Sequence, residues 1–157
     1  MKNNKPPNID DLKNFGFVEC GNWQLQNDGS LQPNINNNPK NVLYAFATKG
    51  VVGYIGITEG TLKGRLKNSY AKLVYEGIRK CLQDKQDVVI LCHKPEPDDH
   101  IKYRDIKIDL LSGLEIPLQR KFKTQWTTKG HGGLKKIIQE VINEIIIMYH
   151  NGNVLFY

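Results

Sequence analysis

The sequence is poor in cysteine, and its three cysteines show no metal-binding spacing. Cys20, Cys81 and Cys92 make an odd count without a Cys-x-x-Cys pair. A zinc knuckle needs ligand pairs at short fixed spacing, and a disulfide framework normally uses an even set. We therefore expect neither a zinc site nor a disulfide framework, and we interpret the neighbouring His93 as a chance adjacency.

Long hydrophobic runs are also missing. The longest apolar segments, 88–92 and 145–149, fall far short of the roughly 20 residues that span a bilayer. The first seven residues show no apolar h-region of a secretory signal. With 39% hydrophobic and 24% charged residues in a chain of 157, the composition is typical of one globular domain. We expect a cytoplasmic location.

Negative charge is absent from residues 116–139, which hold six lysines and arginines. Residues 61–85 hold seven basic side chains against two acidic ones, whereas residues 1–40 are balanced with four of each. The whole chain carries a formal charge of +6. Clustered positive charge favours a polyanionic partner, because each neutralised phosphate releases counterions. A solvated basic face is the alternative interpretation.

The N-terminal part predicts a helix and a hairpin. A short helix is expected at 10–15 and a strand at 17–25, where polar and apolar residues alternate. Asn-Asp-Gly at 27–29 indicates a hairpin turn. The asparagine-rich segment 33–39, with a proline at each end, predicts a loop.

Two further strands, 42–47 and 51–57, predict a tight antiparallel hairpin. Its loop length decides where Tyr44 and Tyr54 point, because side chains alternate along a strand with period two. We predict a three-residue loop with Gly50 in the left-handed conformation, which places the two tyrosines directly opposite each other on one face. A two-residue loop would place them on opposite faces.

The remaining chain is mostly helical in pattern. Pro117 lacks a backbone donor, so the helix around it should begin just before it or kink there. The predicted fold is α+β, a small antiparallel three-stranded sheet flanked by helices. It has an N-terminal β-hairpin in 1–40, a main domain at 41–130 and a long helix in 131–157. We expect helices at 61–67, 73–83, within 112–122 and at 134–149, a strand at 87–92 and a polar loop at 93–103.

The hairpin carries two short sequence words, Val42-Leu43-Tyr44 and Tyr54-Ile55-Gly56. Arg65 follows on an amphipathic segment, and Glu115 lies further on. In this order, residues 42–127 resemble the GIY-YIG nuclease domain. The second word is intact, whereas Val-Leu-Tyr stands where Gly-Ile-Tyr is expected.

The resemblance implies an active site for hydrolysis of phosphodiesters. The tyrosines would act on the attacking water and position it or the phosphate, and Arg65 would hold phosphate oxygens. Ser69 or Tyr70 stands where relatives have a His or Tyr after this arginine. Glu115 would be the single metal ligand. The implied catalytic residues are Tyr44, Tyr54, Arg65, Glu115 and Thr127, the last in place of an expected asparagine.

The implied cofactor is Mg²⁺ or Mn²⁺, and the implied partner is double-stranded DNA. Cutting both strands would suggest a homodimer, with the apolar face of 134–149 either at the interface or buried within the chain. The resemblance and the charge pattern together predict DNA contacts from Lys63, Lys67, Arg120, Lys121, Lys123 and Lys129. An inactive nucleic-acid-binding module with the same basic surface is the alternative function, because Thr127 and Ile57 depart from the family pattern.

Purely structural roles are the alternative interpretation for several of these residues. Tyrosine is common in strands for its packing alone. Ser112 and Glu115 fit a capping box, in which Glu115 would serve only the start of a helix. Asp98, Asp105 and Lys107 superficially mimic the PD-(D/E)xK nuclease pattern, which short segments match by chance. His131 fits a basic loop better than a DNA contact.

Overall fold

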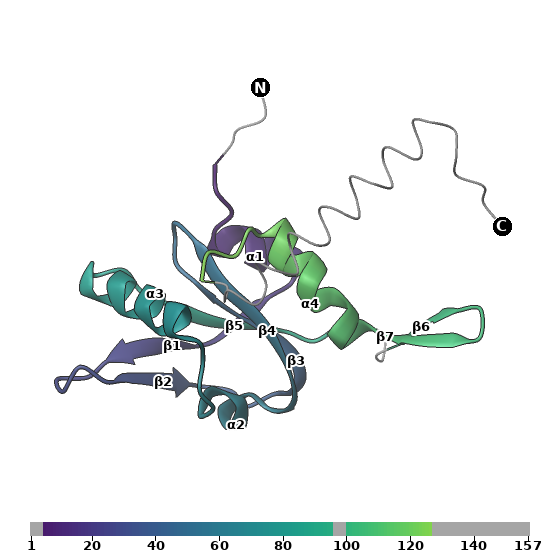
Figure 1. Ribbon diagram of the computed structural model, residues 1–157, viewed down its shortest axis with the longest axis horizontal. Helices are drawn as coiled ribbons and strands as arrows, with labels where there is room; N and C mark the ends of the chain where they lie inside the picture. Colours follow the sequence, from purple (N-terminus) through teal and green to yellow (C-terminus); the bar gives the residue numbers. More distant parts are fainter. Residues whose placement is uncertain (1–4, 96–99, 127–157) are drawn as a thin grey trace. The chain divides into compact units, whose positions relative to one another are not determined.

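The computed structural model describes residues 5–95 and 100–126, which belong to one compact α+β unit (Figure 1). Five antiparallel strands form one sheet in the order β2-β1-β5-β3-β4, and β6 and β7 form a separate two-stranded ribbon. The elements are α1 (Ile9–Phe15), β1 (Val18–Leu25), β2 (Leu31–Ile35), β3 (Lys40–Ala47), β4 (Val52–Thr61), α2 (Leu62–Leu66), α3 (Lys72–Gln83), β5 (Val89–His93), β6 (His100–Tyr103), β7 (Ile106–Asp109) and α4 (Leu110–Lys121).

The α+β class is confirmed, but the sheet is larger than the predicted three strands. The N-terminal hairpin is not an addition beside the main sheet, because β1 pairs with β5, for example at Glu19 with Leu91. The predicted turn is present, with Gly29 at φ +80°. The loop predicted at 33–39 begins too early, since Pro33 lies within β2. An outer strand tolerates a residue without a backbone donor.

The two motif tyrosines lie on one face of the β3–β4 hairpin, as predicted, but their register differs from the prediction. Tyr44 pairs with Gly56, and Tyr54 pairs with Phe46. The tyrosines are therefore diagonal neighbours rather than directly opposite residues. Their ring centroids are 5.9 Å apart, with a tilt of 38° between the planes.

A β-bulge, rather than the loop, brings the tyrosines to the same face. The Thr48 N–H donates to the Val51 carbonyl at 2.8 Å, which leaves only a two-residue tip. Such a tip alone would put the tyrosines on opposite faces. The pairing shifts next to Gly53, and this extra residue reverses the alternation along β4. The left-handed conformation predicted at Gly50 is not found.

The two faces of the sheet bury separate cores. Alternate residues of β3 point to opposite sides, so Leu43 and Ala45 enter one core and Tyr44 and Phe46 the other. Helices α1 and α4 cover the first face, and α2 and α3 cover the second (Figure 1). We call the second layer, with its many aromatic rings, the tyrosine face.

Helix α4 begins earlier than predicted. Asp109 is its N-cap and accepts from the backbone N–H groups of Leu111 and Ser112. The capping box of Ser112 and Glu115 is therefore not the start of this helix. Pro117 lies inside the helix rather than in its first turn. The apolar side of α4 faces the sheet, with Leu111 and Leu118 buried in the core.

The chain crosses the free edge of β4 after α4 ends. Phe122 packs in the core under α4, whereas Trp126 packs on the tyrosine face. Between them the backbone follows the edge strand, since the Trp126 N–H donates to the Gly53 carbonyl at 2.7 Å. Trp126 thus lies beyond the end of α4.

The cysteine prediction was wrong, because Cys20 and Cys92 form a disulfide with a sulfur–sulfur distance of 2.08 Å. They lie on the neighbouring strands β1 and β5, although 72 positions separate them in the sequence. Cys20 is the extra residue where the pairing shifts between Glu19 and Gly21. Nothing in the cysteine count indicated this strand pairing, and Cys81 remains a free thiol.

Two more predictions concern the second half of the chain. The polar loop predicted at 93–103 instead contains β6, which pairs with β7. The helix predicted at 134–149, His131 and the Asp98 of the alternative nuclease pattern lie outside the described residues. Among the helices that are described, none has the length and apolar content needed to cross a membrane.

Candidate active site

Four side chains of the tyrosine face form a cluster at the side of β4: Tyr44, Tyr54, Arg65 and Tyr70. Strand β3 supplies Tyr44, β4 supplies Tyr54, and α2 supplies Arg65. Thr61 starts α2 by accepting the Gly64 N–H at 3.1 Å, which orients the short helix that carries the arginine. We call these four residues the tyrosine–arginine cluster.

The guanidinium of Arg65 lies over the phenol rings. Its central carbon is 4.5 Å from the ring centroid of Tyr70 and 5.8 Å from that of Tyr44. Stacking on aromatic faces suits the flat arginine head, whose donors lie in the plane of the group and point sideways. Burial alone would lower the pKa of Arg65, but the phenols of Tyr44, Tyr70 and Tyr54 outweigh it and raise that pKa. The arginine is therefore a permanent cation.

The tyrosines differ in exposure and hence in what they can do. Tyr44 has no exposed surface, and the Tyr70 hydroxyl donates to its hydroxyl at 3.3 Å. Burial raises the pKa of Tyr44 well above its usual range, and burial raises that of Tyr70 to about 12. Both phenols are neutral at physiological pH, so Tyr44 is not a base there. Tyr54 is half-buried and is the more accessible of the two motif tyrosines.

Gly56 makes room for this packing. A β-carbon at Gly56 would lie 2.8 Å from the Tyr44 hydroxyl oxygen and 2.8 Å from a ring carbon of Tyr54. Gly56 lies inside β4, and its missing side chain lets the two phenol rings meet above it.

Glu115 approaches β4 from the other layer of the molecule. It is half-buried on α4, and its carboxylate Oε1 lies 3.5 Å from the amide Nε2 of Gln119, one turn along the helix. The same amide donates to the Ile55 carbonyl at 2.9 Å. Because Ile55 directly precedes Gly56 and follows Tyr54, this link ties the glutamate to the strand that carries the second motif word.

The structure thus groups three of the predicted catalytic residues, Tyr44, Tyr54 and Arg65. It connects Glu115 to them through the backbone of β4. Sequence reasoning missed Gln119, although its spacing of four from Glu115 on a predicted helix could have indicated a contact. It gave Tyr70 only a minor place, yet that residue touches both Tyr44 and Arg65.

The side chains available as metal ligands fit a metal ion that is held mainly by substrate and water. Within residues 5–95 and 100–126, no group of three or more histidine, cysteine or acidic side chains could cage a cation. Mg²⁺ typically keeps several waters and takes only one or two carboxylates together with phosphate oxygens. A single glutamate such as Glu115 is compatible with that pattern.

The predicted DNA-binding lysines and arginines fall into two groups. Lys63 and Lys67 are exposed on and beside α2, next to Arg65. The second group, at the end of α4, is also exposed, but α4 covers the opposite face of the sheet. This second group consists of Arg120, Lys121 and Lys123. Thr127 and Lys129 lie outside the described residues.

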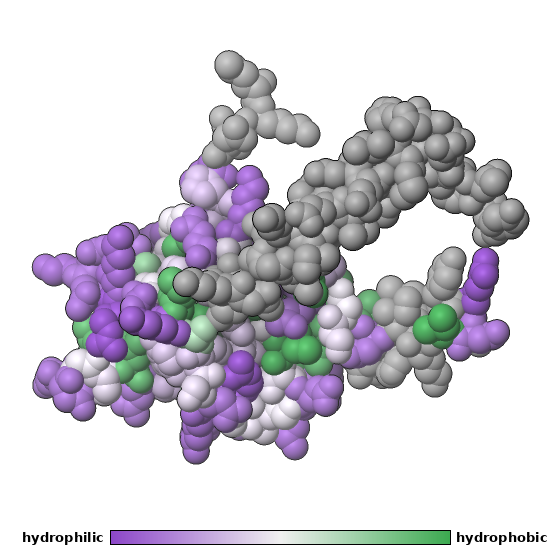
Figure 2. All heavy atoms as spheres, viewed as in Figure 1, coloured by the Kyte–Doolittle hydropathy of each residue, from purple (hydrophilic) through white to green (hydrophobic). Residues whose placement is uncertain are grey.

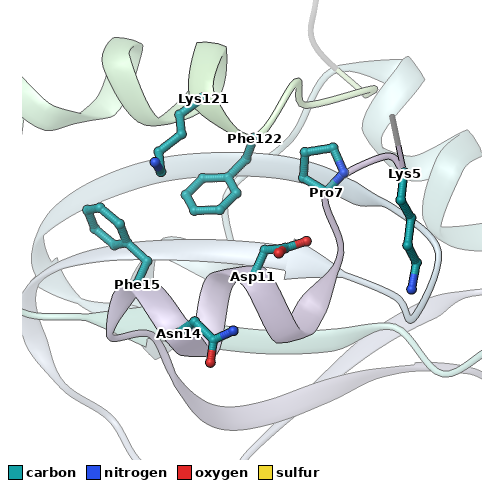
Figure 3. A pocket seen from close by; sticks show the side chains of 7 residues that line it. All are labelled: Lys5, Pro7, Asp11, Asn14, Phe15, Lys121 and Phe122. Atoms are coloured by element: carbon teal, nitrogen blue, oxygen red, sulfur yellow. The ribbon is translucent and has the colours of Figure 1, made fainter. Parts of the chain in front are cut away.

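A cavity of about 420 Å³ lies between α1 and the end of α4 (Figure 3). Phe15, Phe122 and Lys121 line it together with the N-terminal segment. Its acidic residue, Asp11, already accepts the Asn8 N–H at 2.8 Å in the capping box of α1. This cavity belongs to the layer opposite the tyrosine–arginine cluster and brings no catalytic set of side chains together.

The fold and the cluster define an α+β domain with an arginine stacked on paired phenols beside an edge strand. The structure is similar to a solved structure of bacteriophage T4 EndoII, in a variant with one glutamate replaced by alanine. The two share 16% sequence identity at a TM-score of 0.59, over 76% of this chain and 97% of that one. This likeness shows the fold. No protein-family profile matches the sequence, and no curated protein matches it significantly.

Proposed function

We propose that this protein is a divalent-metal-dependent DNA endonuclease of the GIY-YIG type. The observation that carries the proposal is that the candidate catalytic residues meet at β4. Arg65 and the phenols reach this strand from one layer, and Glu115 is tied to it from the other through Gln119. The shared fold with phage T4 EndoII, whose name denotes an endonuclease, supports the same conclusion.

In this proposal Arg65 binds the scissile phosphate. A guanidinium holds two phosphate oxygens at once and offsets the negative charge that grows in the transition state. Tyr54 is the accessible phenol beside it and orients the attacking water by hydrogen bonding. Tyr44 and Tyr70 act as positioning residues, because their hydroxyls bond to each other beneath the arginine.

Glu115 holds the metal in this proposal, and Mg²⁺ or Mn²⁺ supplies Lewis-acid polarisation of the phosphate when bound. Gln119 keeps the glutamate close to β4. Lys63 and Lys67 flank Arg65 and hold the DNA backbone on either side of the cut. Thr127 takes the place of the family's asparagine as a hydrogen-bond donor.

The remaining basic residues, Arg120, Lys121, Lys123 and Lys129, would bind more distant phosphates. One such site cuts one strand. Cleavage of both strands therefore implies two copies of the chain, arranged as a homodimer.

Plasmid cleavage tests the proposal. We expect purified protein to nick or linearise a supercoiled plasmid with Mg²⁺, and to lose this activity when the metal is chelated. Glu115→Ala should abolish cleavage while DNA binding persists, whereas Glu59→Ala, which removes an exposed carboxylate at the end of β4, should leave cleavage intact. Equal cleavage by wild type and Glu115→Ala would refute the proposed metal site.

A second candidate is a module that binds nucleic acid without cutting it. The burial of Tyr44, whose hydroxyl is already engaged by Tyr70, favours it, because a family tyrosine that is sealed off cannot contact substrate directly. The same assay separates the two functions. Salt-sensitive DNA binding with no cleavage in wild type, at any divalent metal tested, would favour the module.

A further inference from the structure

The β6–β7 ribbon is the feature that the proposed active site leaves unexplained. Its two strands pair only with each other and take no part in the five-stranded sheet. Figure 1 shows it extending away from that sheet, beyond the start of α4. An isolated two-stranded hairpin gains little stability by itself, so its presence calls for a role other than building the core.

The end of the ribbon is exposed and presents both charged and apolar side chains. Arg104 occupies the left-handed region with φ +55°, which makes the tight turn between the strands. Arg104 and Asp105 are exposed, and the adjoining Ile106 is 63% exposed. Figure 2 shows a small hydrophobic group beside hydrophilic side chains at this end of the molecule. In the major groove, arginine reads base edges and apolar side chains contact the thymine methyl group.

The ribbon carries more basic than acidic residues. The sequence gives it three basic residues, Lys102, Arg104 and Lys107, and a basic segment favours a polyanionic partner. Its two acidic residues are Asp105 and Asp109, of which Asp109 accepts the first N–H groups of α4.

The ribbon also has the right dimensions and connection. Two strands lie about 4.8 Å apart, and the major groove of DNA, about 12 Å wide, admits a two-stranded ribbon. Asp109 ends β7 and is at the same time the N-cap of α4, with no loop between them. A ribbon seated on DNA would therefore orient the helix that carries Glu115.

We propose that the β6–β7 ribbon inserts its tip into the major groove of duplex DNA next to the cleaved bond. Arg104 contacts base edges or phosphates there, and Ile106 packs against the groove wall. The inference rests on the proposed DNA substrate and adds a site of groove recognition outside the tyrosine–arginine cluster.

Duplex binding by matched variants tests the ribbon. Arg104→Asn removes the charge but keeps a residue that favours the left-handed turn, and Lys85→Asn makes the same change at φ +58° elsewhere on the surface. We expect Arg104→Asn to weaken binding of a short duplex about tenfold at moderate salt and to lower the log–log salt slope by about 1. Lys85→Asn should bind like wild type. Asp105→Asn should bind more tightly than wild type, a gain that unfolding cannot produce.

The outcomes separate this inference from the proposed function. Unchanged affinity and salt slope in both Arg104→Asn and Asp105→Asn would overturn the ribbon's role, even if cleavage depends on Glu115. Weakened binding in Arg104→Asn with no cleavage by wild type would support the ribbon and refute the endonuclease. Absence of salt-dependent duplex binding by wild type would refute both.

Discussion

Tyr70 shows how one residue outside the motif words holds the proposed site together. Its ring carries the Arg65 guanidinium, and its hydroxyl bonds to Tyr44. Burial raises its pKa to about 12, so the folded protein keeps this phenol neutral at pH values where an unfolded chain would ionise it at about pH 10.

This difference predicts a loss of stability in alkali. Below about pH 10 both states hold the proton, and the full stability is present. Between about pH 10 and pH 12 the unfolded state releases protons first, so the free energy of unfolding falls as pH rises. Denaturant unfolding over this range should show a shallower fall in Tyr70→Phe than in wild type. An identical pH dependence in the two proteins would contradict the raised pKa.

Gly56 is the second residue on which the cluster depends. Gly56→Ala would bring its methyl group against Tyr44 and Tyr54 and should cost about 1–3 kcal/mol of stability by overpacking. It should also reduce cleavage by displacing Tyr54. Gly60→Ala, further along the same strand, is the control, because its β-carbon would meet nothing closer than 3.8 Å. Equal stability of the two variants by denaturant unfolding would argue against this packing.

At the scale of elements, α3 and β4 are joined by a tryptophan held between two glycines. A β-carbon at Gly77 on α3 or at Gly53 on β4 would lie 2.4 Å and 2.1 Å, respectively, from atoms of the Trp126 ring. Trp126 is 8% exposed, and its backbone N–H donates to the Gly53 carbonyl of the edge strand β4. The small residues on both elements therefore form a slot that fits its indole.

This slot predicts a reversal of the usual helix rule. Replacing a glycine inside a helix by alanine normally stabilises by up to about 1 kcal/mol. Gly77→Ala should instead destabilise by roughly 1–3 kcal/mol, because the methyl group meets the indole. The exposed Gly113→Ala in α4 serves as the control and should follow the usual rule. Thermal and denaturant unfolding measure both, and stabilisation in Gly77→Ala would refute the slot.

Contacts between helices and strands also explain which sequence predictions failed. Helices α1, α2 and α3 were predicted from local sequence patterns and were confirmed. The bulge at Gly53 has no local sequence signal, and the indole of Trp126, which packs against this glycine, comes more than seventy residues later. The β6–β7 ribbon was missed because its alternation is short and lies beside a proline-rich segment.

At the scale of the whole molecule, the Cys20–Cys92 disulfide ties the N-terminal hairpin to the centre of the sheet. A cross-link over 72 positions restricts the unfolded chain, and such links typically contribute about 2–4 kcal/mol. Reduction should therefore lower the free energy of unfolding by about this amount. Cys81→Ser, which removes the free thiol, should keep the sensitivity to reductant.

Thiol counting supplies the check on that prediction. The denatured, unreduced protein should show one reactive thiol per chain, and Cys81→Ser should show none. Three reactive thiols in the wild-type chain would mean that the bond does not form under the conditions tested.

The sequence alone determined the order of the chemical groups, the basic stretches and the local elements, because these depend on neighbouring residues and on side-chain type. Only the tertiary structure decided which face each tyrosine occupies, how Glu115 reaches β4, and which cysteines meet. Those features depend on strand pairing and on packing between residues far apart in the chain, and no local pattern encodes them.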